Sequence, residues 1–299
     1  MEKQIQNVHP MKVLLADAER GNYAVGSFSP RNTPMIAAVM RAGQAVKSPL
    51  IVQISQKELT WVGLTVMEFA TGFLEAYREV GPTVPMALHL DHTWEFDIIK
   101  QAILSGFTSV MIDASGKELD ENIAITREVV AYAHERGVTV EAELGRIFSA
   151  DTAETDSDEE LYTDPDEAER FVLETGVDAL AVSVGTAHGV YMVRQPKIDL
   201  ERLIAIRKRT PVHLVLHGGS GVPEDMMASA IHLPGGGVSK VNIATDLEQA
   251  LLASLGKEKR ISNTELKQLS PEVLTKASQA VEAVVVDKMV NFLGSSGKG

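Results

Sequence analysis

Three histidines of this sequence have neighbours that suit a metal site. His92 ends the segment His-Leu-Asp-His, and His188 and His217 are each followed by a glycine. Three neutral imidazoles around an open fourth position form a catalytic zinc site, in which water or substrate takes the vacancy. A single buried histidine is more often a hydrogen-bonded core residue. The zinc interpretation therefore depends on these three rings lying together.

The other histidines fall at positions that favour different roles. His9, His134 and His232 lie in a predicted tail, helix and loop, and His213 begins a predicted strand. We expect structural or surface roles for these four. His89 has two interpretations, a core residue or a residue that orients a metal ligand.

Carboxylates also occur where predicted strands end. Asp91 precedes His92, Asp113 ends the next strand, and Glu141 and Glu143 end the one after it. Ionised carboxylates at such positions can act as acid/base groups or can support a metal site.

Two further segments have the composition of an anion site, Gly-Gly-Ser-Gly and Asn-Ile-Ala-Thr. Backbone N–H groups of Gly219, Ser220 and Thr245 are suitable donors for a phosphate. The side chains of Ser220, Asn242 and Thr245 add further donors. The alternative is a pair of tight turns that need glycine for a positive φ.

Eight runs of apolar and β-branched residues predict strands, several of them buried on both faces as in parallel sheets. The runs are Tyr23–Phe28, Leu50–Ile54, Val84–Leu90, Ser109–Ile112, Val138–Glu143, Ala179–Val184, Val212–Leu216 and Ser239–Ile243. Helical patterns lie between them, as at Pro34–Val46, Asp120–Arg136 and Asp166–Thr175.

This alternation predicts an α/β protein, a single (β/α)8 TIM barrel over residues 1–299 with a helical C-terminal extension. An open doubly wound sheet is the alternative. In a barrel the carboxyl ends of the strands meet at one mouth, where active sites are built. The barrel therefore predicts that the histidines, carboxylates and glycine-rich segments converge.

The composition narrows the class of protein. The 299 residues include 41 acidic and 28 basic side chains, a formal net charge of −13, and no cysteine. The acidic balance argues against nucleic acid, which is bound by clustered lysine and arginine. Without cysteine there is no disulfide, thiolate nucleophile or cysteine-ligated metal. Neither a long apolar run nor a signal segment is evident, so we expect a cytoplasmic protein without a membrane partner.

Six motifs give the sequence a resemblance to the class II, zinc-dependent ketose-bisphosphate aldolases, which include fructose- and tagatose-1,6-bisphosphate aldolases. The similarity covers most of the chain, from the first predicted strand to the C-terminal segment FLGSSGKG. The motifs are HLDH (His89–His92), SVMIDAS (Ser109–Ser115), VEAELG (Val140–Gly145), GTAHG (Gly185–Gly189), LVLHGGSG (Leu214–Gly221) and KVNIATDL (Lys240–Leu247).

The resemblance implies a reversible retro-aldol reaction that converts a phosphorylated ketose into dihydroxyacetone phosphate and an aldehyde, as in glycolysis. It implies that the three histidines bind zinc and that Asp91 is the acid/base at the C4 oxygen. Asp113 and Glu143 are implied as polar neighbours that can hold the metal in an alternative position. Ser55 is implied to approach the substrate.

The resemblance also implies how the substrate phosphate is bound. Carbonyl groups of Gly189, Gly218 and Ser220 would hold a monovalent cation, Na⁺ or K⁺, beside the phosphate. Ser220, Asn242 and Thr245 would bind the phosphate itself.

The sequence departs from the family pattern after Gly145. Relatives often have Gly-Gly-x-Glu-Asp in this loop, and their loop glutamate protonates the carbanion, whereas this chain reads Arg-Ile-Phe-Ser-Ala-Asp. Asp151 and Glu154 are the candidate replacements. Both lie in the acidic segment 150–160, which is predicted to be either a solvated surface loop or a mobile lid over the active site.

Three other departures bear on the substrate. Ser29 stands where relatives commonly have asparagine, and the Asp-Pro-Arg segment of many relatives is missing from Ile261–Ala277. Ala244 stands where fructose-type enzymes often have aspartate, which favours the tagatose-type branch. The substrate expectation is therefore broad, a tagatose- or fructose-1,6-bisphosphate-like ketose.

Two rival functions use the same residues differently. Lys240 could form a Schiff base with the ketose in a metal-independent aldolase. A catalytically silent barrel could instead bind sugar phosphates as a partner subunit. For the zinc aldolase we expect a homodimer or homotetramer, by analogy with the family.

Overall fold

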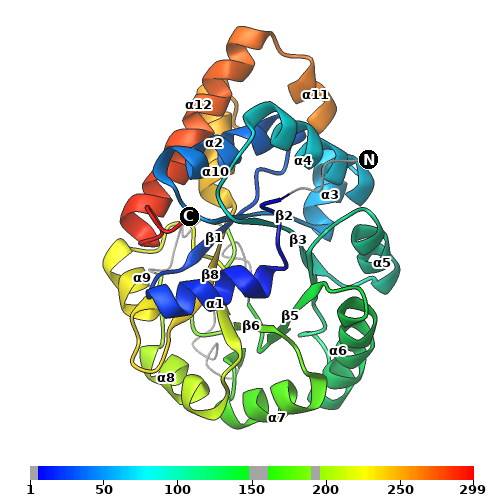
Figure 1. Cartoon of the computed structure of the whole chain (residues 1–299), viewed down its shortest axis with the longest axis vertical. Coiled ribbons are helices and arrows are strands. Elements are labelled where there is room, and N and C mark those ends of the chain that lie inside the picture. Colours follow the sequence, from blue (N-terminus) through cyan, green and yellow to red (C-terminus); the bar gives the residue numbers. More distant parts are fainter. Residues whose placement is uncertain (1–5, 148–160, 190–195) are drawn as a thin grey trace.

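A computed structural model of the chain describes residues 6–147, 161–189 and 196–299. Eight parallel strands form a closed barrel in chain order, with helices packed around it (Figure 1). The strands are β1 (Val25–Phe28), β2 (Leu50–Ser55), β3 (Met86–Thr93), β4 (Ser109–Ile112), β5 (Thr139–Leu144), β6 (Ala179–Val182), β7 (His213–Leu216) and β8 (Val238–Ile243).

The first and last strands close the sheet. β1 pairs with β8 so that Val25 lies opposite Lys240 and Phe28 lies opposite Ile243. The prediction of a (β/α)8 barrel is confirmed, and the open doubly wound sheet is wrong because β1 and β8 are neighbours rather than edges. All eight predicted strands occur, and the largest extension is in β3, which continues through Asp91 to Thr93.

The helices follow the strands as the periodicity predicts. They are α1 (Met11–Gly21), η1 (Thr33–Met35), α2 (Ile36–Val46), α3 (Gln56–Val62), α4 (Val66–Val80), α5 (Phe96–Leu104), α6 (Leu119–His134), α7 (Pro165–Thr175), α8 (Leu200–Arg209), α9 (Glu224–Ile231), α10 (Thr245–Leu255), α11 (Asn263–Lys267), α12 (Pro271–Asp287) and η3 (Lys288–Phe292).

The local sequence explains where α7 begins and ends. The side chain of Asp164 accepts hydrogen bonds from the backbone N–H groups of Asp166 and Glu167, and Pro165 occupies the first turn. Gly176, with φ of 69°, ends the helix in the left-handed conformation that glycine adopts without a steric cost. Comparable signals mark the ends of α3. Ser55 and Glu58 form a capping box at its N-terminus.

The amino-terminal end of the barrel is closed by α1. Four buried residues of this helix, Met11, Leu14, Leu15 and Ala18, belong to one apolar cluster with inward residues of the strands. In Figure 1, α1 crosses the barrel. This end is therefore packed, and the carboxyl ends of the strands are left for a site.

The C-terminal helices lie outside the ring. α12 packs against α2 and α10, and α11 with the start of α12 projects at the top of Figure 1. Arg41 of α2 donates to Glu282 of α12 at 3.0 Å. The final residues return to the barrel, where the Gly299 N–H donates to the carbonyl of Lys47 at 2.7 Å. In the described part of the chain, no helix has the length and apolar character needed to cross a membrane.

Candidate active site at the carboxyl ends of the strands

An irregularity in β3 brings His92 to the barrel mouth. The pairing of β3 with β4 shifts between Leu90 and Thr93, and His92 has a φ of 22°. In a regular strand, Asp91 and His92 would point to opposite faces. A local irregularity of this kind re-aims a side chain. As a result, Asp91 and His92 line the same cavity.

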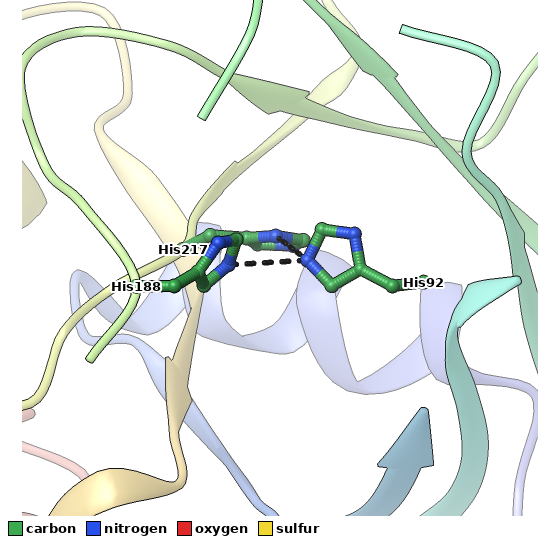
Figure 2. A group of neighbouring side chains, drawn as sticks. All are labelled: His92, His188 and His217. Atoms are coloured by element: carbon green, nitrogen blue, oxygen red, sulfur yellow. Dashed lines mark hydrogen bonds between the residues drawn. The ribbon is translucent and has the colours of Figure 1, made fainter. Parts of the chain in front are cut away.

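The three predicted metal ligands lie together. Nε2 of His92 is 3.1 Å from Nε2 of His188, which follows β6. It is 2.8 Å from Nδ1 of His217, which follows β7. Figure 2 shows the three rings turned toward one another. Each ring presents one nitrogen to a common point.

Carboxylates fix the outer nitrogens of two of these rings. Nδ1 of His92 lies 2.8 Å from Oδ2 of Asp113, and Nε2 of His217 lies 2.9 Å from Oε1 of Glu141. An ionised carboxylate can only accept, so each of these ring nitrogens carries the proton. The opposite nitrogens, His92 Nε2 and His217 Nδ1, therefore face the cluster. This is the usual support of a metal-ligating histidine.

The electrostatic field at the cluster favours positive charge. Burial, together with the charge on His92, lowers the pKa of His188 and of His217, so both rings are neutral. Burial also acts to lower the pKa of His92, but Asp91 and Asp113 outweigh it and raise that pKa to about 10. A cation held between the rings would take the place of the proton on His92.

The donor set fits a zinc ion. Tetrahedral zinc with Zn–N distances of about 2.0–2.1 Å sets its nitrogen ligands about 3.3 Å apart. The separations of 2.8 and 3.1 Å need to widen by only a few tenths of an ångström. Three imidazoles also leave the fourth position that a catalytic zinc requires.

Two carboxylate-containing groups adjoin the histidines. His92, Asp113 and Glu143 have ligand atoms within 4.8 Å of one another, as do His89, Asp91 and Glu141. The first group shares His92 with the three-histidine set, in keeping with an alternative metal position. In the second group, Glu141 already pairs with the side chain of Lys240, whose Nζ lies 2.9 Å from Oε2 of Glu141.

Asp91 is buried and held by amide donors. Nε2 of Gln53 donates to its Oδ2 at 3.2 Å, and Nδ2 of Asn242 donates to its Oδ1 at 3.1 Å. Burial alone would raise the pKa of Asp91, but the charge of His92 and the nearby ring of His89, whose Nε2 lies 3.7 Å from Oδ1 of Asp91, hold that pKa well below the usual value. Asp91 is therefore ionised and able to accept a proton.

A cavity of about 440 Å³ joins these groups to most of the other predicted site residues. The predicted residues that line it are Ser55, Asp91, His92, Asp113, His188, Gly189, Gly218, Ser220, Asn242 and Thr245. The lining does not include His217, Gly219 or Glu143, which lie behind it. Asp151 and Glu154, the candidate proton donors, lie outside the described residues.

The two glycines after β7 serve different purposes. Gly218 has a φ of 67°, and a Cβ there would lie 2.3 Å from the carbonyl oxygen of Ala187, so this position requires glycine. The Gly219 N–H donates to the carbonyl of Asn242 at 3.0 Å. The prediction that this N–H is available for phosphate is wrong, because it links the loops after β7 and β8. Thr245 begins α10, so the helix N-terminus faces the cavity.

The opposite wall contains residues that sequence reasoning missed. Nε of Arg31 donates to Glu58 at 2.7 Å, and Arg31 also pairs with Glu248. Arg260 binds Glu248 through two nitrogens, and its guanidinium lies 3.8 Å from the ring centroid of Trp61. All five line the cavity. Only Glu58 had a sequence signal, the Ser-x-x-Glu pattern of a capping box.

Lys57 is a sixth residue of this wall. Its Nζ lies 5.0 Å from the ring centroid of Trp61, and it is exposed. Ser29, where relatives commonly have asparagine, donates its hydroxyl to Glu58 at 2.7 Å. Ser29 therefore contacts Glu58, which lines the cavity, and does not line the cavity itself.

Known proteins share this sequence and this fold. Residues 9–298 match the profile of the family described as fructose-bisphosphate aldolase class II. A fructose-bisphosphate aldolase of Geobacillus stearothermophilus is 39% identical over 294 residues, covering 96% of this chain and 97% of its own. One from Helicobacter pylori J99 is 36% identical over 305 residues, covering 95% and 97%.

A solved structure agrees with these matches. The YdjI aldolase of Escherichia coli K12 has a TM-score of 0.82 and 32% identity, covering 97% of this chain and 99% of its own. The barrel, the histidine cluster and the sequence matches over nearly the whole length lead to one assignment. The chain belongs to the class II fructose-bisphosphate aldolase family, the metal-dependent aldolases, and is a carbon–carbon lyase.

Proposed function

We propose that this enzyme is a zinc-dependent aldolase that cleaves a ketose 1-phosphate, reversibly, into dihydroxyacetone phosphate and an aldehyde. One observation supports this most directly. The nitrogens of His92, His188 and His217 converge, and His92 and His188 line the same cavity as the ionised carboxylate of Asp91. A metal ligand set and a nearby base are the two groups that a retro-aldol cleavage needs.

Each step of the proposed reaction can be assigned to particular residues. When bound, zinc would act as a Lewis acid on the carbonyl side of the bond that breaks. Asp91 takes the proton of the C4 hydroxyl group as the C3–C4 bond breaks, while Gln53 and Asn242 keep its carboxylate oriented. Asp151 or Glu154 returns a proton to C3 of the three-carbon fragment.

We propose that Asp113 and Glu143 accommodate a second metal position. Burial and the charge of Asp113 raise the pKa of Glu143 to about 8, so this carboxyl group is protonated near neutrality. Glu143 would have to lose that proton to serve as a ligand at this position. His92 belongs to both positions and would stay bound in each.

The phosphate would lie at the loops after β7 and β8. Ser220, Asn242 and Thr245 line the cavity there, beside the N-terminus of α10. N–H groups of a first helical turn favour an anion. Carbonyl groups of Gly189, Gly218 and Ser220 are the proposed ligands of a Na⁺ or K⁺ ion that offsets the phosphate charge.

The aldehyde portion would extend toward the opposite wall. Trp61 offers an apolar face and the basic residues Lys57 and Arg260 lie against it. Ser55, the residue that caps α3, also lines this cavity. Whether a tagatose- or fructose-type ketose is preferred depends on contacts here, since these side chains face the substrate beyond C4.

Metal analysis combined with a panel of ketose 1-phosphates and 1,6-bisphosphates tests the proposal. We expect about one zinc per chain, release of dihydroxyacetone phosphate from at least one member, and loss of activity in chelator that zinc restores. A metal-free protein that releases triose phosphate and is trapped by borohydride would support a Schiff-base aldolase. Zinc binding without any product release would favour the silent barrel.

We further propose a cytoplasmic homodimer or homotetramer. The support is the family relationship, since most soluble oligomers are symmetric assemblies of one chain. Sedimentation at several protein concentrations measures the state, and a monomer throughout would contradict this proposal.

A further inference from the structure

Lys240 is a fully buried ammonium group at the centre of the barrel's polar interior. It lies on β8 two residues before Asn242, on the same inward face. Its Nζ is 2.9 Å from Oε2 and 3.2 Å from Oε1 of Glu141. It also donates to Oδ1 of Asn242 at 2.7 Å. Lys240 thus contacts both Glu141 and Asn242, and these two residues contact different parts of the site.

The first contact leads to the metal ligand His217. Glu141 is fully buried, and its carboxylate faces donors from both Lys240 and His217. Its ionised Oε1 accepts from Nε2 of His217 at 2.9 Å. That bond keeps the proton on Nε2 and turns Nδ1 toward the other two histidines. Without Lys240, Glu141 would be a buried charge with little compensation.

The second contact leads to the base, Asp91. An ammonium group has no acceptor, so the atom of Asn242 that faces Lys240 must be its oxygen. The amide nitrogen of Asn242 then faces Asp91 and donates to Oδ1 at 3.1 Å and Oδ2 at 3.3 Å. If the amide were reversed, its oxygen would face the carboxylate of Asp91. Lys240 therefore decides which way Asn242 points.

We propose that Lys240 is a positioning residue that aligns both halves of the active site, His217 through Glu141 and Asp91 through Asn242. This inference rests on the proposed zinc-dependent reaction and gives Lys240 a role other than a nucleophile. Among the described residues, those lining the cavity do not include Lys240. Its ammonium is held behind the residues that face the substrate.

The two contacts can be separated with two variants. In Glu141→Gln the histidine loses its charged acceptor, while the amide oxygen of the glutamine remains an acceptor for Lys240, which still orients Asn242. In the double variant Lys240→Met with Glu141→Gln, both buried charges are removed together, so no unpaired charge remains in the core. The double variant is used because Lys240→Met alone leaves Glu141 uncompensated and can fail to fold.

We expect both variants to bind zinc about 10–100-fold more weakly than the unaltered chain, the usual effect of losing an outer partner of a ligand. At saturating zinc, kcat should fall about tenfold or more in the double variant, because Asp91 loses its alignment. In Glu141→Gln, kcat should fall less than in the double variant, because Lys240 still orients Asn242. Zinc affinity is measured by competition with a chromogenic chelator, and folding by circular dichroism.

Ser239→Ala is the matched control. Ser239 neighbours Lys240 on β8, is equally buried, and donates to the carbonyl of Leu214 at 3.3 Å, away from the site. It should leave zinc affinity and kcat unchanged.

The proposal is overturned if the folded double variant keeps the zinc affinity and kcat of the unaltered chain. It is also overturned if Glu141→Gln lowers kcat as much as the double variant does, or if borohydride traps substrate on Lys240. An unaltered chain that binds no zinc would instead contradict the proposed function.

Discussion

At the scale of single residues, the site depends on the unusual backbone of His92. A φ of 22° is a conformation that residues other than glycine rarely adopt. Strain of this kind persists only when the surrounding contacts hold it. Here Nδ1 of His92 is fixed by Asp113 at 2.8 Å. The result is that the proposed base and a proposed metal ligand, adjacent in sequence, reach the same cavity.

Replacing Asp91 by asparagine tests its role at this scale. The amide would keep the size of the side chain but could not accept the C4 proton, so kcat should fall by about 10²–10⁴. Zinc content should stay near that of the unaltered chain, because Asp91 is not among the three histidine ligands. Steady-state kinetics and metal analysis measure the two effects. Asp97→Asn, on an exposed residue of α5, is the control, and equal activity in both variants would remove Asp91 from the mechanism.

At the scale of elements, the loops after β6 and β7 fit together through backbone contact. Gly218 follows the ligand His217, and the position of its missing Cβ is 2.3 Å from the carbonyl oxygen of Ala187, which precedes the ligand His188. A side chain here cannot be accommodated by a rotamer change, because the clash is with backbone. Glycine therefore sets how closely the two proposed metal ligands approach each other.

Gly218→Ala should separate those loops. We expect zinc affinity to fall at least about tenfold and the free energy of unfolding to fall by about 1–3 kcal/mol, from the strained φ and the clash. Gly176→Ala is a matched control, because its φ of 69° is similar but no atom lies within 4 Å of the added Cβ. It should cost about 1–2 kcal/mol of stability without changing zinc affinity. Equal zinc affinity in the two variants would contradict the loop contact.

At the scale of the whole molecule, the barrel interior divides into two layers with different tasks. Near α1 the interior is apolar, with residues such as Leu15 and Ile51 in one cluster. Toward the mouth it is charged and hydrogen-bonded, with Glu141 and Lys240 fully buried. Barrel interiors are usually filled by branched apolar residues. The charged layer is therefore the part of the core that contacts the candidate active-site residues.

Leu15→Ala tests this division. Loss of a fully buried leucine should lower the free energy of unfolding by about 2–5 kcal/mol, the range for cavity-forming substitutions. Zinc affinity and kcat of the folded protein should be unchanged, because the cavity forms at the opposite end of the barrel. Val13→Ala, on the exposed face of the same helix, should change stability by no more than about 0.5 kcal/mol. Urea unfolding and zinc titration measure both variants, and a parallel loss of zinc affinity in Leu15→Ala would contradict the division.

Much of this could be predicted from the sequence, because it depends on local patterns. Apolar runs gave the eight strands, helical periodicity gave the helices between them, and glycine or proline marked ends such as Gly176. Residue types also narrowed the metal chemistry, since a chain without cysteine has no thiolate ligand to offer. The topology of alternating parallel strands then predicted which ends would converge.

Only the tertiary structure decided how the side chains point and what lies opposite them. The irregularity that turns His92, the use of the Gly219 N–H between loops, and the pairing of Lys240 with Glu141 all depend on register between strands. The wall of Arg31 and Arg260 joins residues from opposite ends of the chain. Such contacts follow from closing the barrel, because β1 and β8 become neighbours only when the eight strands complete the ring.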